Sequence, residues 1–108
     1  MVAWCHGAAG IGLSRHEPRA VQAVRCSPPR ANHALCHGEL GNLEVLPIGE
    51  ARVRAAAIVR APEWICATPF GVESPGLMTG LAGIGYGLLR LAMPERVASV
   101  LRLEGPIK

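Results

Sequence analysis

The sequence is poor in aromatic residues and has no strong excess of one charge, and each shortage excludes a class of protein. Aromatic residues make up 4% of its 108 residues, whereas hydrophobic residues make up 50%. A core of Ala, Leu, Val and Ile with so few aromatic rings is typical of a helical rather than a β-rich protein. The formal net charge of +3 is too small to indicate a nucleic-acid partner. We interpret the dispersed arginines as a solvated surface.

Long apolar runs and a secretory signal are also missing. The longest uncharged stretch, Ser74 to Leu89, is shorter than the roughly 20 apolar residues that span a bilayer. Trp4, Cys5 and His6 follow the start where a signal peptide would have a basic region and an apolar core. We therefore expect no membrane span and a reducing, cytoplasmic location, where four cysteines do not indicate a disulfide scaffold.

Two short motifs, 31 residues apart, place a cysteine beside a histidine and continue into the same Gly-x-x-Gly frame. A third frame begins 42 residues later, with Met-Thr in place of Cys-His. The motifs are Trp4-Cys5-His6-Gly7, Leu35-Cys36-His37-Gly38 and Leu77-Met78-Thr79-Gly80. Such intervals are the size of a two-helix repeat, and thiol and imidazole groups together are typical zinc ligands. The sequence therefore predicts helical repeats, two of which carry metal ligands.

These motifs resemble the cyclase region of lanthionine synthetases, and the third is most similar to the C-terminal end of the bifunctional type II enzymes. The matching segments, among them 35–42 and 75–86, cover nearly the whole chain apart from about 17–31. The resemblance implies an all-α fold, an incomplete arc of an α/α toroid whose repeats have glycine-rich inner helices. It also implies one partial domain over residues 1–108, with 16–31 as a shortened proline-rich linker.

The resemblance further implies a catalytic zinc held by Cys5, Cys36 and His37. Three protein ligands leave a fourth tetrahedral position open, where an incoming thiol is deprotonated. In the family that thiol adds to dehydroalanine or dehydrobutyrine of a dehydrated precursor peptide and closes a thioether ring. The competing interpretation of the three residues is a buried thiol pair beside a capping imidazole. Cys26 and Cys66 lie outside the frames and are expected to be free thiols.

The same reaction needs a general acid/base. In the family a histidine and an aspartate upstream of the first motif fill this role, and the catalytic residues of this chain stay unknown; His6, His16 and His33 are the remaining candidates. We therefore expect a cyclase fragment that is inactive alone and needs a complementary polypeptide to supply the missing helices. Two alternatives stay open: a non-catalytic zinc or peptide-binding module, and a decayed remnant.

Apolar spacing and prolines predict the local structure. Asn42 is a candidate to orient a ligand, whereas Trp4, Trp64 and Tyr86 are expected to pack. The predicted segments are a helix start over 7–14, a linker over 16–31 without a continuous helix, a helix from the second motif to about Leu46, an amphipathic helix over 50–59 with Val53, Ala56 and Ala57 on one side, and the strongest helix over 75–91.

Overall fold

The computed structural model describes residues 2–15 and 17–104, and this part of the chain is helical. Its only β pairing is an isolated bridge between Val2 and Gly7, so the all-α prediction is confirmed. No helix within the described ranges is long and apolar enough to cross a membrane. The elements are α1 (Ala8–Arg15), α2 (Pro18–Cys26), α3 (Glu39–Leu43), α4 (Ile48–Arg60), the 3₁₀ turn η1 (Pro69–Gly71) and α5 (Leu81–Ala92).

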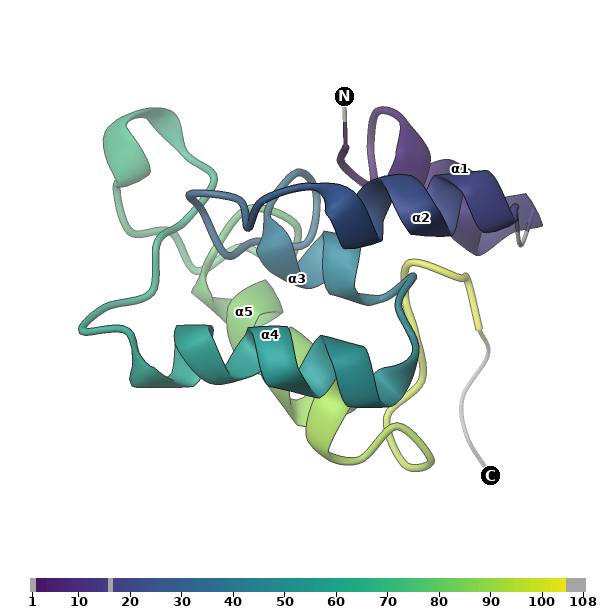
Figure 1. The fold of residues 1–108 in the computed structure, drawn as a ribbon. Helices are drawn as coiled ribbons and strands as arrows, with labels where there is room; N and C mark the ends of the chain where they lie inside the picture. Colours follow the sequence, from purple (N-terminus) through teal and green to yellow (C-terminus); the bar gives the residue numbers. More distant parts are fainter. Residues whose placement is uncertain (1, 16, 105–108) are drawn as a thin grey trace.

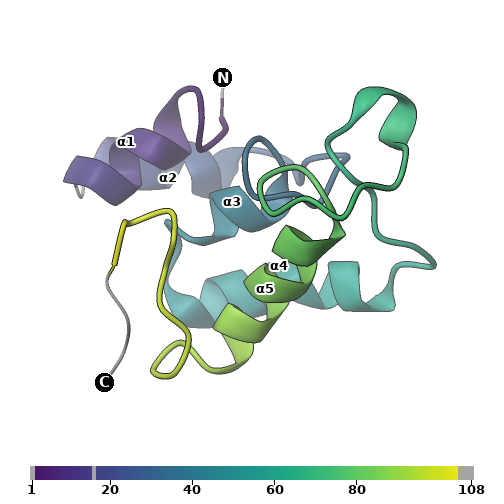
Figure 2. The ribbon, with the colours of Figure 1, turned by 180° about the vertical axis from the view of Figure 1, so that it is seen from behind.

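The short helix α3 lies at the centre of the molecule. The antiparallel pair α1 and α2 covers it from one side, and α4 and α5 pack against it from the other (Figures 1 and 2). The largest fully buried apolar side chains come from α3, from the loop before it and from its neighbours: Leu35, Leu40, Leu43, Ile84 and Val24. The segment after α5 is fixed by the Tyr86 hydroxyl, which donates to Ala98 O at 2.6 Å. An incomplete toroid arc stays a prediction.

The segment 16–31 differs from the predicted linker because α2 lies inside it. Pro18 occupies the first turn, where a missing N–H costs nothing, and the Glu17 carboxylate accepts a hydrogen bond from Arg19 N at 3.0 Å. Ala20 and Val24 are buried by the packing of α2 on α1. The prolines therefore mark the two ends of a short helix that the composition of this segment did not predict, and a linker role for 16–31 stays a prediction.

Three other helices are shifted or turned relative to the predictions. The helix after the second motif ends at Leu43 instead of Leu46, and the last helix begins only at Leu81. For α4 the predicted side was wrong, because Val53 is 75% exposed. Its buried side is instead formed by Ala51, Ala55 and Ile58.

The second glycine of each frame brings the start of its helix against the preceding motif. A Cβ atom on Gly10, Gly41 or Gly83 would lie 2.3, 1.8 or 1.7 Å from a carbonyl oxygen six residues earlier, that of Trp4, Leu35 or Leu77. In each frame this carbonyl precedes the Cys-His or Met-Thr pair. Only glycine permits such close approach. The three frames thus form the same local structure, which supports the interpretation of the motifs as repeats.

Gly41→Ala is expected to lower the free energy of unfolding by about 1–3 kcal/mol, because the added methyl group must displace the Leu35 carbonyl. Gly49→Ala is the matched control, since Gly49 is exposed in α4 with no atom within 4 Å of its Cβ position. Alanine there should be neutral or stabilise the helix by up to about 1 kcal/mol. Urea unfolding of both variants measures the difference, and equal stability would contradict the close-packed frame.

Candidate metal centre

Backbone hydrogen bonds join the three motifs side by side. Cys5 N donates to Cys36 O at 3.0 Å, and Cys36 N donates to Met78 O at 2.9 Å. Cys5, Cys36 and Met78 hold the same position in their motifs. They therefore lie side by side in a row, although they are far apart in the sequence. This row brings the thiol of the first motif beside the Cys-His pair of the second.

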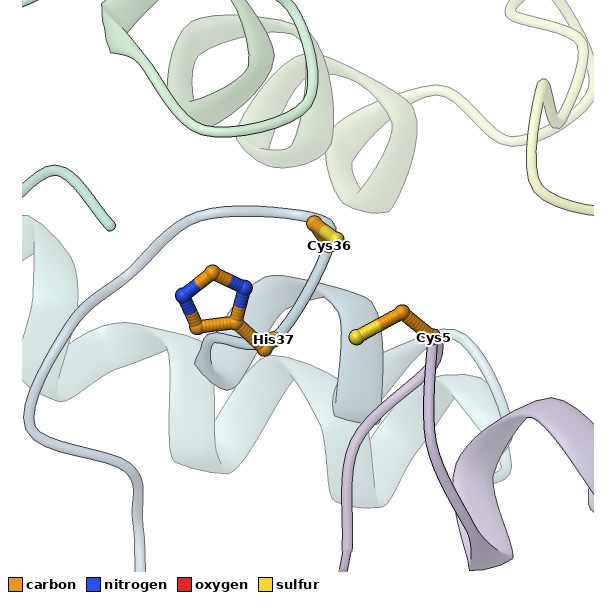
Figure 3. A group of neighbouring side chains, drawn as sticks. All are labelled: Cys5, Cys36 and His37. Atoms are coloured by element: carbon orange, nitrogen blue, oxygen red, sulfur yellow. The ribbon is translucent and has the colours of Figure 1, made fainter. Parts of the chain in front are cut away.

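The predicted ligands Cys5, Cys36 and His37 converge. Their donor atoms all lie within 4.8 Å of one another, and Figure 3 shows the Cys5 side chain pointing toward His37 from the neighbouring loop. Ligands of a tetrahedral zinc lie roughly 3.3–3.8 Å apart, so small side-chain movements would bring the three donors onto one ion. The two thiols and one imidazole fit zinc in their chemistry and in their placement.

Partial burial affects the Cys36 thiol. Its pKa is raised, first because burial disfavours the thiolate and then because the Cys5 thiol hydrogen-bonds and interacts with it electrostatically. A proton therefore competes more strongly with a metal ion at Cys36 than at an ordinary cysteine. Cys5 is exposed, and His37 is half-buried, so the donor group is open to solvent on the Cys5 side.

Arg30 and Glu39 hold the loop that carries Cys36 and His37. Arg30 Nε donates to His37 O at 3.2 Å, and Arg30 N donates to Glu39 Oε1 at 3.3 Å. Glu39 begins α3 and is 2% exposed. Its two carboxylate oxygens also accept hydrogen bonds from the Arg54 guanidinium of α4 at 2.9 and 3.0 Å. The ligand loop is thereby fixed to α4 from behind.

Two arginines are therefore partly buried ion-pair partners and not part of a solvated surface, so that interpretation was wrong for them. Arg54 pairs with Glu39, and Arg90 Nε donates to Glu44 Oε1 at 3.1 Å. The four side chains are between 3% and 18% exposed. Sequence reasoning missed both pairs, because a single arginine in a helix gives no sign of a partner far along the chain.

Two comparisons relate this chain to known proteins. Residues 59–102 match the family described as lanthionine synthetase C-like protein. The lacticin 481/lactococcin biosynthesis protein LcnDR2 of Lactococcus lactis subsp. lactis is 28% identical to this chain over 138 residues, which is 91% of the chain.

The chain is similar to the lanthionine synthetase C-like family. The resemblance inferred from the motifs is thus confirmed. The chain spans 15% of the length of the lactococcal relative. The 138 aligned positions exceed the 108 residues of this chain, so the matching segment of the relative contains residues that this chain lacks. No solved structure matches the chain.

The acid/base candidates of this chain lie in different places. His6 Nδ1 is 3.3 Å from Cys5 Sγ, beside the donor group and exposed. His33 Nδ1 instead accepts a hydrogen bond from Ile65 N at 3.0 Å, and burial lowers the pKa of this imidazole against the opposing effect of the Glu39 charge. His16 lies outside the described residues. An acid/base role for any of them stays a prediction.

Asn42 connects α3 to the segment that carries Cys5. Its side-chain Nδ2 donates to Val2 O at 3.1 Å, and the residue is fully buried. Its Oδ1 has no hydrogen-bond partner among the described residues. Asn42 therefore positions the backbone leading into the first motif, and its side chain makes no hydrogen bond to any of the three ligands in the part of the chain that the structure describes.

The other two cysteines are separate from the donor group. Cys26 is an exposed free thiol at the end of α2, where Gln22 Nε2 donates to its sulfur at 3.1 Å. Cys66 is a buried free thiol, 2% exposed, with its sulfur 4.0 Å from Ser74 O. Both are free, as the sequence predicted.

Proposed function

We propose that this chain carries the zinc centre of a lanthionine cyclase, which forms thioether rings in lanthipeptide (lantibiotic) precursor peptides. The observation that supports this most directly is the convergence of Cys5, Cys36 and His37 within 4.8 Å. The ligands come from two motifs that are 31 residues apart, in a chain similar to the lanthionine synthetase C-like family. A structural role for the three residues would not require donors open to solvent.

Cys5, Cys36 and His37 would hold the ion, and the backbone row through Met78 orients them. When bound, zinc would deprotonate a peptide cysteine and keep its thiolate nucleophilic. Addition of that thiol to dehydroalanine or dehydrobutyrine in the same peptide closes the ring. The exposure of Cys5 leaves the side from which a peptide would approach open. The ligand thiols must stay reduced, so we also infer a cytoplasmic setting.

The proton transfers that accompany ring closure need a further group. The chain contains no aspartate, and no carboxylate joins the donor group in the part that the structure describes. A general acid/base contributes about 10²–10⁴-fold, so ring closure by this chain alone should be close to the uncatalysed rate. We propose that a complementary polypeptide supplies this group.

A peptide thiol is expected to enter the coordination sphere of the bound metal. Cobalt(II) can replace zinc as a spectroscopic probe, and adding a dehydrated peptide with one free cysteine should increase thiolate-to-cobalt absorption, because a third thiolate then binds. The same peptide with serine in place of cysteine should leave the spectrum unchanged. Identical spectra with both peptides would contradict the proposed function. Ring closure is followed in the same samples by mass spectrometry after alkylation of the remaining thiols.

A further inference from the structure

Cys5 and Cys36 meet as a pair of thiols independently of any metal. Their sulfur atoms lie within 4.8 Å, and their backbones are joined by the hydrogen bond from Cys5 N to Cys36 O at 3.0 Å. A disulfide joins sulfur atoms about 2.05 Å apart, so the two sulfur atoms need to approach each other by less than about 3 Å. Figure 3 shows the two side chains close to each other.

The two thiols also differ from the other cysteines in access. Cys5 is exposed and Cys36 is half-buried beside it, so an oxidant in solution reaches Cys5 first. Cys66 is shielded in the core, and Cys26 is exposed on α2 but belongs to no group of potential ligands in the described ranges. Cys5 and Cys36 are therefore the two cysteines whose proximity and exposure favour oxidation to a disulfide.

We propose that Cys5 and Cys36 form a reversible disulfide in the metal-free chain, so that oxidation and metal binding exclude each other at this centre. Two of the three donors are consumed by the bond, and His37 alone cannot retain zinc. Conversely, a bound ion occupies both thiolates and protects them. The proposal concerns control of the site by its redox environment and needs no cyclase activity.

The oxidant is a low-molecular-weight disulfide, such as glutathione disulfide. The Cys5 thiolate attacks one of its sulfur atoms, which forms a mixed disulfide and releases one glutathione. The Cys36 thiolate then attacks the Cys5 sulfur and releases the second glutathione. The two protein thiols lose two protons and two electrons in total. The two released glutathione molecules take up these protons and electrons and become thiols. A dithiol reductant reverses the reaction.

Peptide mapping of the metal-free full-length chain tests this bond directly. After incubation with glutathione disulfide and alkylation of the remaining thiols, trypsin separates all four cysteines into peptides 1–15, 26–30, 31–52 and 61–90. We expect a cross-link between 1–15 and 31–52 as the main product. Cys26→Ser should give the same cross-link, whereas Cys36→Ser should stop at a glutathione adduct on Cys5. A stable adduct on Cys5 of the unmodified chain, or a main cross-link to 26–30, would overturn the proposal.

Zinc protection tests the mutual exclusion. With free zinc at about 100 times its Kd, the metal-free fraction and the oxidation rate should fall about a hundredfold, and the oxidised chain should bind no zinc until it is reduced. Equal zinc binding before and after oxidation would overturn the exclusion. If the reduced chain bound no zinc, the proposed function would fail, but a cross-link between Cys5 and Cys36 would still support the disulfide.

Discussion

Cys36→Ala is expected to abolish zinc binding, from about one ion per chain to nearly none, because only one thiolate and one imidazole remain. Cys36 is the best residue for this test, since its backbone is held on both sides, by Cys5 N and by Met78 O. The substitution should therefore remove a donor without moving its neighbours. Zinc content after gel filtration, together with a competitive chelator titration, measures the effect.

Cys26→Ala is the matched control for the zinc experiment. Cys26 is an exposed thiol outside the donor group, so the variant should retain its zinc. Circular dichroism of both metal-free variants checks that the helices persist. Equal zinc loss from the two variants would mean that the cysteines bind metal without regard to the motifs, and the assignment of the centre would fail.

Arg54→Met is expected to lower the free energy of unfolding by about 3–5 kcal/mol, because it leaves the Glu39 carboxylate buried without its partner. Glu39 is 2% exposed, and the guanidinium donates to both of its oxygens. Small domains are typically stable by only about 5–15 kcal/mol, so the loss is a large part of the total. Urea denaturation of the metal-free chain measures it.

Two further variants distinguish a buried ion pair from a general effect of removing an arginine. Arg25 pairs with Glu50 at 2.9 Å, but both side chains are more than 40% exposed, so Arg25→Met should change stability little. Replacing Glu39 with leucine together with Arg54→Met should recover part of the loss, because no buried charge is then left unpaired. If Arg54→Met lowered the free energy of unfolding as little as Arg25→Met, the Glu39 carboxylate would have to be solvated.

Arg54 also illustrates where sequence reasoning failed. Glu39 and Arg54 are 15 residues apart, on different helices, and whether they meet depends on how α4 crosses α3. The same crossing decides that Ala51, Ala55 and Ile58 are buried while Val53 faces water. The residues of α4 alternate too evenly between apolar and charged to specify which side is buried. The buried side is instead set by the positions of α3 and α5, which pack against α4.

The local features were readable because each depends on residues close in the sequence. The Cys-His pairs, their glycine frames and the helices that follow are fixed by short-range sterics, and the resemblance to the lanthionine synthetase C-like family came from the same motifs. The start of α2 at Pro18 has a local cause as well, since proline is favoured in the first helical turn. The number of prolines in 16–31 concealed it.

The sequence by itself indicated the helical class, the three glycine frames and the candidate metal ligands, because thiol, imidazole and glycine each have a specific chemistry wherever they are placed. Only the tertiary structure decided that Cys5 reaches Cys36 and His37, through backbone bonds between segments far apart in the chain. The tertiary structure also decided which arginine side chains are shielded from solvent. Such contacts depend on the packing of whole helices, whose energy is shared among many weak apolar contacts and is not encoded at any single position.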